Sequence, residues 1–290
     1  MEKKYKLTEE TINVGDKTLH RIEALRDFGD VKKGDKGGFI ENEKNLSKSG
    51  DCWVYENAKV YGNAKVFGNA TIFGNAQIRC DAVVCEDAKI CGNAEVFGNA
   101  KVFGNATIFG NAQISCDAVV CEDAKIYGNV WVYDNAIICG NARVFGNARV
   151  FDNARVYGNA KVYGNAIISS NAVICGNAMV RGKANVYSHA DIRGDAVITA
   201  DTDYIVFKNW WSSGRFFTWT RSNNMWRVGC FYGTSNELIE KAYKDSKLSG
   251  KEYKRVIDYV NSILNVNEYD NIRKNIKERL LSKIRKLFGK

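Results

Sequence analysis

Two series of hydrophobic positions run through the middle of the chain at intervals of six residues. One series holds Ala from Ala58 to Ala196, 24 positions in all, with Val130 as the exception. The other holds only Val or Ile at 25 positions from Val54 to Ile198. The repeating unit is G-[ND]-A-x-[VI]-x. Its two hydrophobic residues are two positions apart, so they share one face of a strand, whereas a helical period would spread them around the axis.

The polar part of the unit predicts a bend after each short strand, because Gly, Asn and Asp tolerate a positive φ. A strand and a bend every six residues are typical of a parallel β-helix. Residues 64–93 and 100–129 are identical at 28 of 30 positions, 36 residues apart. A duplicated block must hold whole coils, and 36 is two coils of 18 but not a multiple of 24. We therefore predict a three-sided prism of about eight coils, 18 residues each.

The periodicity divides the chain into four parts. We expect residues 51–200 to form the β-helix and residues 1–50 to cap its first coil. Residues 201–234 predict aromatic-rich antiparallel strands, three in number, with turns at SSG and SNN. Residues 235–290 predict a helical C-terminal region, so that the whole is mainly β with a small α+β module at the end.

Two helix starts are marked in that region by capping-box patterns, Thr234…Glu237 and Ser249…Glu252. The last helix, residues 271–290, is basic and carries an apolar stripe at helical spacing. We expect this helix to contact another subunit, a nucleic acid or a membrane surface. The stripe consists of Ile272, Ile276, Leu280, Ile284 and Leu287.

Outward-facing residues fall into columns when the chain is written in rows of 18. We expect like side chains to stack along the corners of the prism. One corner holds Tyr55, Phe73, Cys91, Phe109, Tyr127, Phe145 and Tyr163, and another holds Phe67, Cys85, Phe103, Cys121, Cys139, Tyr157 and Cys175. An apolar groove for a ligand is the alternative interpretation of these columns.

The composition and charge of the chain indicate where the protein is located and how its cysteines are used. No apolar run approaches the ~18 residues that span a bilayer, and the N-terminal sequence lacks the apolar core of a signal peptide. We therefore expect a cytoplasmic protein. Its nine Cys recur at repeat positions rather than as CxxC pairs, which favours reduced packing residues and no metal site. The net charge is +9, and most of it belongs to residues 200–290.

The six-residue unit resembles the hexapeptide-repeat proteins, which form left-handed β-helices. The stretch ALRDFGDVKKGDKGGFIENEKNLSKSGDCWVYENA resembles the opening of uncharacterised bacterial and prophage members of that group, which are labelled acyltransferases. The resemblance covers roughly residues 5–200. It implies a left-handed coil and association into a homotrimer. Under an acyltransferase activity it also implies acyl-CoA bound between subunits and a His general base, for which His189 is the candidate within the repeats.

Two sets of basic residues are candidates for holding an anion. Arg143, Arg149 and Arg155 fall on three consecutive faces of about one coil, flanked by Lys125 and Lys161. They form either a basic girdle around a ligand or a solvated surface that keeps the prism soluble.

The second set lies in the aromatic-rich strands, where arginines alternate with large aromatic residues. Such surfaces stack nucleotides. The alternative is a small capping core with its arginines pointing outward. The candidate residues are Arg215, Arg221, Arg227, Trp219 and Trp226.

These observations favour a non-catalytic, homo-oligomeric β-helix protein, a trimer by the resemblance, that binds a small anionic ligand or a protein partner without a cofactor. A phage-encoded protein that sequesters a nucleotide-like signal is the sharper version of this hypothesis. An acyl-CoA-dependent transferase using His189 is one alternative. A purely structural scaffold is the other.

Overall fold

The computed structural model describes residues 3–264 of the chain. These residues form two compact units, which are treated separately below. The first extends to Phe207 and includes Phe216–Asn223, and the second consists of Lys208–Arg215 and the described residues from Asn224 onward. Within the described residues, no helix has both the length and the apolar character needed to cross a membrane.

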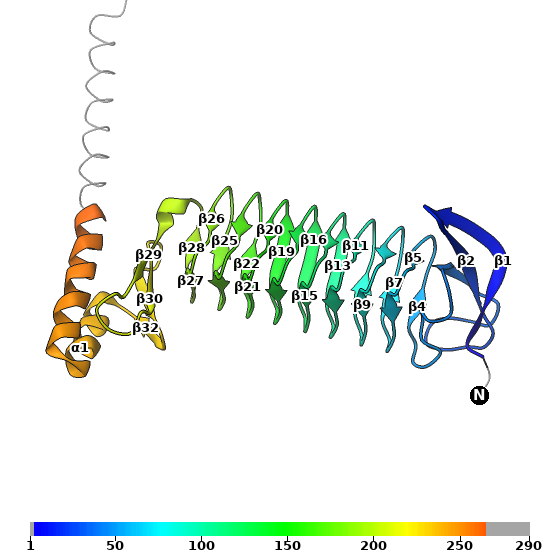
Figure 1. The fold of residues 1–290 in the computed structure, drawn as a ribbon, viewed down its shortest axis with the longest axis horizontal. Helices are drawn as coiled ribbons and strands as arrows, with labels where there is room; N and C mark the ends of the chain where they lie inside the picture. Colours follow the sequence, from blue (N-terminus) through cyan, green and yellow to red (C-terminus); the bar gives the residue numbers. More distant parts are fainter. Residues whose placement is uncertain (1–2, 265–290) are drawn as a thin grey trace, which may run out of the picture. The chain divides into compact units, whose positions relative to one another are not determined.

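The first unit is a parallel β-solenoid with three sheets (Figure 1). The first sheet contains β3 (Lys36–Ile40), β5 (Lys59–Val60), β8 (Gln77–Ile78), β11 (Glu95–Val96), β14 (Gln113–Ile114), β17 (Trp131–Val132), β20 (Arg149–Val150), β23 (Ile167–Ile168) and β26 (Asn185–Val186). The second contains β4 (Trp53–Val54), β7 (Thr71–Ile72), β10 (Lys89–Ile90), β13 (Thr107–Gly110), β16 (Lys125–Gly128), β19 (Arg143–Gly146), β22 (Lys161–Val162), β25 (Met179–Val180) and β28 (Val197–Ile198). The third contains β6 (Lys65–Val66), β9 (Val83–Val84), β12 (Lys101–Val102), β15 (Val119–Val120), β18 (Ile137–Ile138), β21 (Arg155–Val156), β24 (Val173–Ile174) and β27 (Asp191–Ile192).

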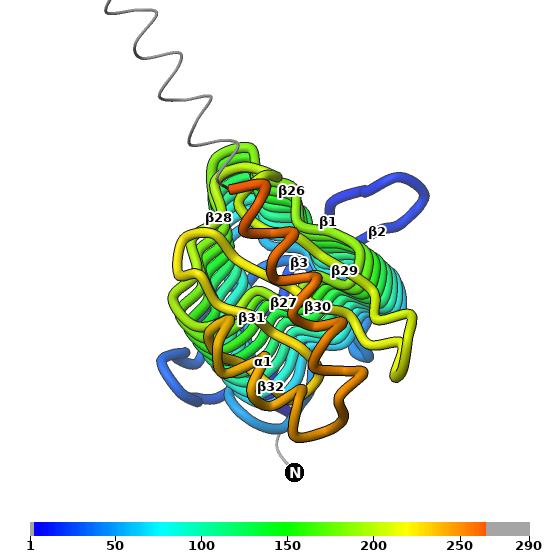
Figure 2. Tube along the Cα trace, turned by 90° about the vertical axis from the view of Figure 1, so that its left-hand side faces the viewer, coloured from blue at the N-terminus to red at the C-terminus, as the bar shows by residue number. Residues whose placement is uncertain are grey.

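The register of these sheets confirms the predicted coil of 18 residues. Lys89 pairs with Thr71 on one side and with Thr107 on the other, and the neighbouring strands repeat the same step. Seen along the axis, successive coils superimpose (Figure 2). The solenoid has about nine turns, against about eight predicted. The additional turn lies in the segment expected to be a cap, where Phe39 already pairs with Lys59 and Leu46 with Val66.

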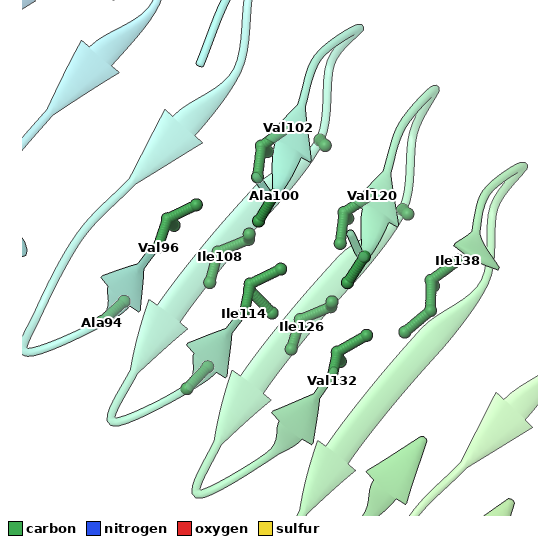
Figure 3. Packing of buried hydrophobic residues seen from close by; sticks show 14 of the residues in the cluster. Ala94, Val96, Ala100, Val102, Ile108, Ile114, Val120, Ile126, Val132 and Ile138 are labelled. Atoms are coloured by element: carbon green, nitrogen blue, oxygen red, sulfur yellow. The ribbon is translucent and has the colours of Figure 1, made fainter. Parts of the chain in front are cut away.

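The core of the solenoid is built from the two six-step series, as predicted. Every Ala of the first series and Val130 are fully buried, and the Val and Ile positions of the second are at most 1% exposed. Figure 3 shows some of these side chains converging from all three sheets, among them Val102, Ile108 and Ile114. At roughly 1.5–3 kcal/mol for each fully buried Val or Ile, this narrow column contributes on the order of tens of kcal/mol of favourable free energy to folding.

The corners carry the positive φ angles that the Gly-Asn pairs predict. Gly128, for example, has φ +92°, and a Cβ placed there would lie 2.7 Å from the carbonyl oxygen of Gly146 in the next coil. At the same corner a ladder of asparagines joins successive coils, each Nδ2 donating to the next Oδ1 over 2.9–3.2 Å. The ladder consists of Asn75, Asn93, Asn111, Asn129, Asn147 and Asn165.

Most of the hydrogen bonds between coils run in one direction, which gives the two ends of the solenoid largely opposite chemistry. The N–H of Lys59 donates to the carbonyl of Ala76 in the next coil, 2.9 Å away, and later coils repeat the pattern. A smaller number run back to the previous coil, as from the N–H of Val66 to the carbonyl of Asn45 at 2.9 Å. The first coil therefore presents mostly unpaired carbonyl groups, and the last coil presents mostly unpaired N–H groups. Each end needs side chains of the complementary kind to close it.

The N-terminal segment closes the carbonyl end. Strands β1 (Tyr5–Val14) and β2 (Lys17–Ala24) form an antiparallel hairpin, and β2 pairs antiparallel with β3. Just before β1, the fully buried Lys4 donates from Nζ to the carbonyls of Gly50 and Cys52 at 2.8 and 2.7 Å. The equivalent carbonyls one coil later accept backbone N–H groups. The Lys4 ammonium thus replaces a missing coil.

Residues after the last coil close the N–H end with side-chain oxygens. A short helix η1 (Asp201–Asp203) leads into β29 (Tyr204–Lys208), and β30 (Phe216–Thr220) follows. The N–H groups of Asn185, Asp191 and Val197, one from each sheet, are among the donors at this end. They donate to Asp201 Oδ1, Thr218 Oγ1 and Ser222 Oγ over 2.7, 2.9 and 2.7 Å.

The second unit contains a hairpin and two helices. Strands β31 (Met225–Val228) and β32 (Phe231–Gly233) pair antiparallel across Gly229, which has φ +55°. The aromatic-rich segment therefore contains four short strands, β29–β32, rather than the three predicted, because Gly229 allows one extra turn.

The first helix of this unit, α1 (Ser235–Asp245), begins with the predicted capping box of Thr234 and Glu237. The second helix starts at residue 247 and continues to 264. The predicted start at Ser249 is wrong. Ser246 is the cap, since its Oγ accepts the N–H of Ser249 at 3.0 Å, and Ser249 is already helical. The predicted basic helix 271–290 lies outside the described residues.

Candidate ligand-binding surface

Three cations lie directly beside one another on the second sheet. Lys125, Arg143 and Lys161 are the first residues of β16, β19 and β22, and their Cα atoms are paired in register. All three side chains are exposed. Adjacent strands are ~4.8 Å apart, so the charges form a straight row about 10 Å long. We call this row the cationic column.

The cationic column has no acidic partner within residues 3–264, where the ion pairs involve other residues. Two like charges ~5 Å apart repel by about 1 kcal/mol in bulk water. Like charges opposite one another in a sheet are destabilising for this reason. An anion lying along the row would relieve that repulsion.

An aromatic column runs parallel to the cations, two residues further along each strand. Phe109, Tyr127, Phe145 and Tyr163 stack with centroid separations of 5.0, 4.8 and 4.6 Å and interplanar angles of at most 6°. This confirms the predicted stacking at that corner. Because each ring covers its neighbour, the stack leaves no gap into which a base could intercalate. The rings can contact a ligand only through their edges.

Arg143, Arg149 and Arg155 do not form one site, contrary to the predicted girdle. They lie on β19, β20 and β21, which belong to the second, first and third sheets. Side chains on three faces of a prism point in three directions, so a small anion can contact one of them at a time. Arg149 instead lies over the ring of Trp131, 5.2 Å from its centroid. Of the three, only Arg143 belongs to the cationic column.

The arginines of the aromatic-rich strands are divided between the two units. Arg221 belongs to the first unit, and its backbone N–H donates to the carbonyl of Asp203 at 2.8 Å. Arg215 and Arg227 belong to the second unit. Arg215 is exposed, whereas Arg227 is half-buried and donates from Nη1 to the carbonyl of Phe231 at 3.2 Å.

The two tryptophans expected to stack a ligand are core side chains. Trp219 and Trp226 are 2% and 1% exposed. The Trp226 indole N–H donates to Ser235 Oγ at 3.0 Å. With both indoles enclosed, the aromatic part of this candidate site provides packing, as the alternative interpretation of these strands holds.

His189 sits at a corner of the last complete coil and is exposed. Its ring stacks on Phe216 of β30, with centroids 3.9 Å apart and an interplanar angle of 3°. Within residues 3–264 the His189 ring makes no hydrogen bond to a side chain that would orient it. A general base needs such an orienting partner, so the geometry at His189 is that of a packed corner residue.

One hollow on the first unit was not foreseen from the sequence. It has a volume of about 410 Å³ and lies beside the irregular first coil. There, paired residues such as Phe39 and Lys59 are more than the usual 18 residues apart along the chain. The amide of Asn45 is already saturated, because it donates to the carbonyls of Gly62 and Ala64 and accepts the N–H of Asn42. The sequence did contain one indication of this hollow, because residues 40–52 lack the G-N-A unit that forms the regular coils. The lining residues are Asn42, Lys44, Asn45, Gly62, Asn63, Lys65, Asp81 and Val83.

Comparison with known proteins supports the solenoid alone. Residues 138–150 and 148–161 match a family model described as the YdcK beta solenoid repeat. These stretches run from β18 to the start of β22 and include two members of the cationic column, Arg143 and Lys161. No curated protein matches the chain.

Proposed function

We propose that this protein is a non-catalytic binding protein whose ligand is an extended anion held along the cationic column. The observation that carries the proposal is the stacking of Lys125, Arg143 and Lys161 in register without acidic partners. A solvated surface gains nothing from aligning like charges, whereas a binding surface gains from concentrating them along one line.

The shape of the column selects the kind of anion. The sheet is flat, and its charges repeat at ~4.8 Å along the solenoid axis. A linear polyanion can satisfy all three cations at once, whereas a mononucleotide reaches only one or two of them. The ring edges of the neighbouring aromatic column add apolar contact without reading sequence. Single-stranded nucleic acid is the ligand class that combines a charged backbone with apolar groups.

The test is fluorescence anisotropy with a labelled oligothymidylate, comparing two variants that each remove one positive charge. Arg143→Gln interrupts the cationic column. Lys101→Gln removes an exposed cation of the third sheet whose two register neighbours, Val83 and Val119, carry no charge. We expect Arg143→Gln to weaken binding about tenfold and to lower the salt slope by roughly 0.7, and Lys101→Gln to change binding less than about twofold.

Equal losses in the two variants would contradict the proposal, because binding would then follow net charge alone. Absence of oligonucleotide binding at low salt would also contradict it. Sequestration of a nucleotide signal, the narrower hypothesis suggested by the resemblance, predicts instead that a mononucleotide binds as tightly as the oligonucleotide. In every case mass spectrometry of the recovered ligand should show it unchanged.

The acyltransferase alternative lacks an observation that favours it over binding. His189, its candidate base, packs against Phe216 and is exposed at a corner rather than set in a pocket. Failure to bind acyl-CoA in a calorimetric titration would remove this alternative.

A further inference from the structure

A cluster of potential metal ligands lies at one corner of the solenoid, away from the cationic column. The thiols of Cys121 and Cys139 and a carboxylate oxygen of Glu122 all lie within 4.8 Å of one another. The two cysteines follow β15 and β18, whose residues Val120 and Ile138 are paired in register. The thiols therefore occupy equivalent positions one coil apart. Cys121 is 9% exposed, Cys139 is half-buried and Glu122 reaches solvent.

The Glu122 carboxylate is held in place rather than free to turn into solvent. Glu122 occupies the corner position of its repeat with φ +57°. Its Oε2 accepts the backbone N–H of Gly140, one coil on, at 2.7 Å. Hydrogen bonds of this kind fix the orientation of carboxylate ligands in metal sites.

We propose that Cys121, Cys139 and Glu122 bind one zinc ion, with a water molecule as its fourth ligand. Two thiolates and a carboxylate suit a borderline-soft divalent cation. Ligand atoms around tetrahedral zinc lie about 3.5 Å apart, so side-chain rotations alone would bring the three groups to bonding positions. The site departs from the expectation that the cysteines only pack, and it is independent of the proposed anion binding.

Metal binding at this corner must release protons. Burial raises the pKa of Cys121 to about 12 and also raises the pKa of Cys139. Both groups are therefore thiols at neutral pH, and each S–H proton leaves for solvent as its Zn–S bond forms. With two protons displaced, the apparent affinity should rise up to about 100-fold for each unit of pH below the thiol pKa values.

The duplicated block supplies a matched control within the same chain. Cys85 and Glu86 repeat the Cys121–Glu122 pair 36 residues earlier, and Glu86 Oε2 accepts the N–H of Gly104 at 2.8 Å. The residue one coil beyond Cys85 is Phe103, so that pair of coils has one thiol where the proposed site has two. Cys139→Phe converts the proposed site into this natural counterpart, which the solenoid already accommodates.

The experiment titrates the reduced full-length chain with Cd²⁺ alone and follows the ultraviolet thiolate-to-cadmium absorption, then repeats the titration with Zn²⁺ in competition with a chelating dye. We expect one equivalent to bind. Cys121→Ser, Cys139→Ser and Cys139→Phe should each abolish the cadmium absorption. Glu122→Gln should weaken binding at least tenfold, whereas Cys85→Ser and Glu86→Gln should leave it unchanged.

The melting temperature of each variant is measured to exclude unfolding as the cause. Retention of the cadmium absorption in a folded Cys139→Phe variant would overturn the proposal. An equal loss in Cys85→Ser would overturn it as well, because the metal would then bind elsewhere. An affinity that does not change with pH would contradict coordination by two buried thiols.

Discussion

Lys4→Met would remove the group that closes the carbonyl end of the solenoid. Methionine keeps the apolar stem but has no donor, so the carbonyls of Gly50 and Cys52 would lose the Nζ donor that now lies 2.8 and 2.7 Å away. It would also remove the ammonium that lies 4.4 Å from the centroid of the Phe28 ring. The variant thus tests whether the directional chemistry of the solenoid end matters for stability.

The size of the effect follows from two opposing contributions. A buried carbonyl left unpaired costs about 1–3 kcal/mol. The bond to Cys52 is buried and the bond to Gly50 only partly so, which makes roughly 6 kcal/mol the upper limit for the pair. Against this, the variant no longer has to bury an ammonium, a cost already visible in the pKa of Lys4, which burial lowers. We expect the free energy of unfolding to fall by about 3 kcal/mol.

The pH dependence of this difference has a definite sign. The lowered pKa means that the folded state holds the Lys4 proton less tightly than the unfolded chain, whose value is near 10.5. Between the two values the unfolded state binds more protons, so the wild type gains stability as pH rises. The methionine variant lacks this gain. The difference between the two proteins should therefore widen as pH approaches 10.5.

Urea denaturation measures the global effect, and hydrogen exchange at the amides of residues 45–60 measures the local one. Lys6→Met is the control, since Lys6 forms an exposed ion pair with Glu23 at 2.9 Å and its loss should cost less than about 0.5 kcal/mol. If Lys4→Met and Lys6→Met proved equally stable, or if exchange in the first coil were unchanged, the capping argument would be refuted.

Three further predictions concern the corners, the far end and the thiols. Gly128→Ala places a Cβ 2.7 Å from the Gly146 carbonyl oxygen at φ +92°, whereas Gly34→Ala has φ +91° with open space around it; in thermal melts the first should cost about 2 kcal/mol more. Tyr204→Phe unpairs the N–H of Tyr187 and the carbonyl of Asn185 and should cost about 2 kcal/mol. Because burial raises the pKa of Tyr204 to about 12, its contribution should persist below pH ~10 and disappear as pH rises through 12, as denaturation at several pH values would show. Mass spectrometry after brief alkylation should find three of the nine cysteines modified first, namely Cys80, Cys116 and Cys230.

The solenoid was predictable because its information is local and repeated. Each strand of the repeats places the same Ala and Val or Ile pair inward, so the period alone fixes the register, the core and the stacking of the outward columns. The 36-residue duplication added the number of sides, which no single repeat contains. Handedness stays an expectation from the resemblance.

The irregular parts were harder to predict because their signals are not periodic. Residues 36–50 join the first coil although they lack the G-N-A unit, since pairing with β5 decides their structure. Ser246 and Ser249 are both plausible caps, and local sequence cannot choose between them. The fourth short strand exists because the chain turns at a single residue, Gly229.

The candidate sites, too, were predictable only in the parts that follow from the repeat. The cationic column follows directly from the 18-residue period, yet counting the three arginines as one girdle ignored that neighbouring faces of a prism diverge. The same 18-residue period also predicts that Cys121 and Cys139 are neighbours in adjacent coils. Their possible chemistry was missed because the search considered close spacing along the chain, whereas the solenoid brings residues together at a distance of one coil.

The prevailing direction of the hydrogen bonds between coils has a consequence for self-association. The groups left open on an unprotected last coil, mostly donors, match those on an unprotected first coil, mostly acceptors, whereas two copies of the same end would place like groups opposite one another at most positions. A chain that lost both closures would therefore polymerise head to tail into a polar filament. Consider a mixture of two variants, one lacking only the N-terminal closure and the other lacking only the C-terminal closure. This mixture should yield dimers, because each dimer has both of its outer ends closed and cannot grow into a longer polymer.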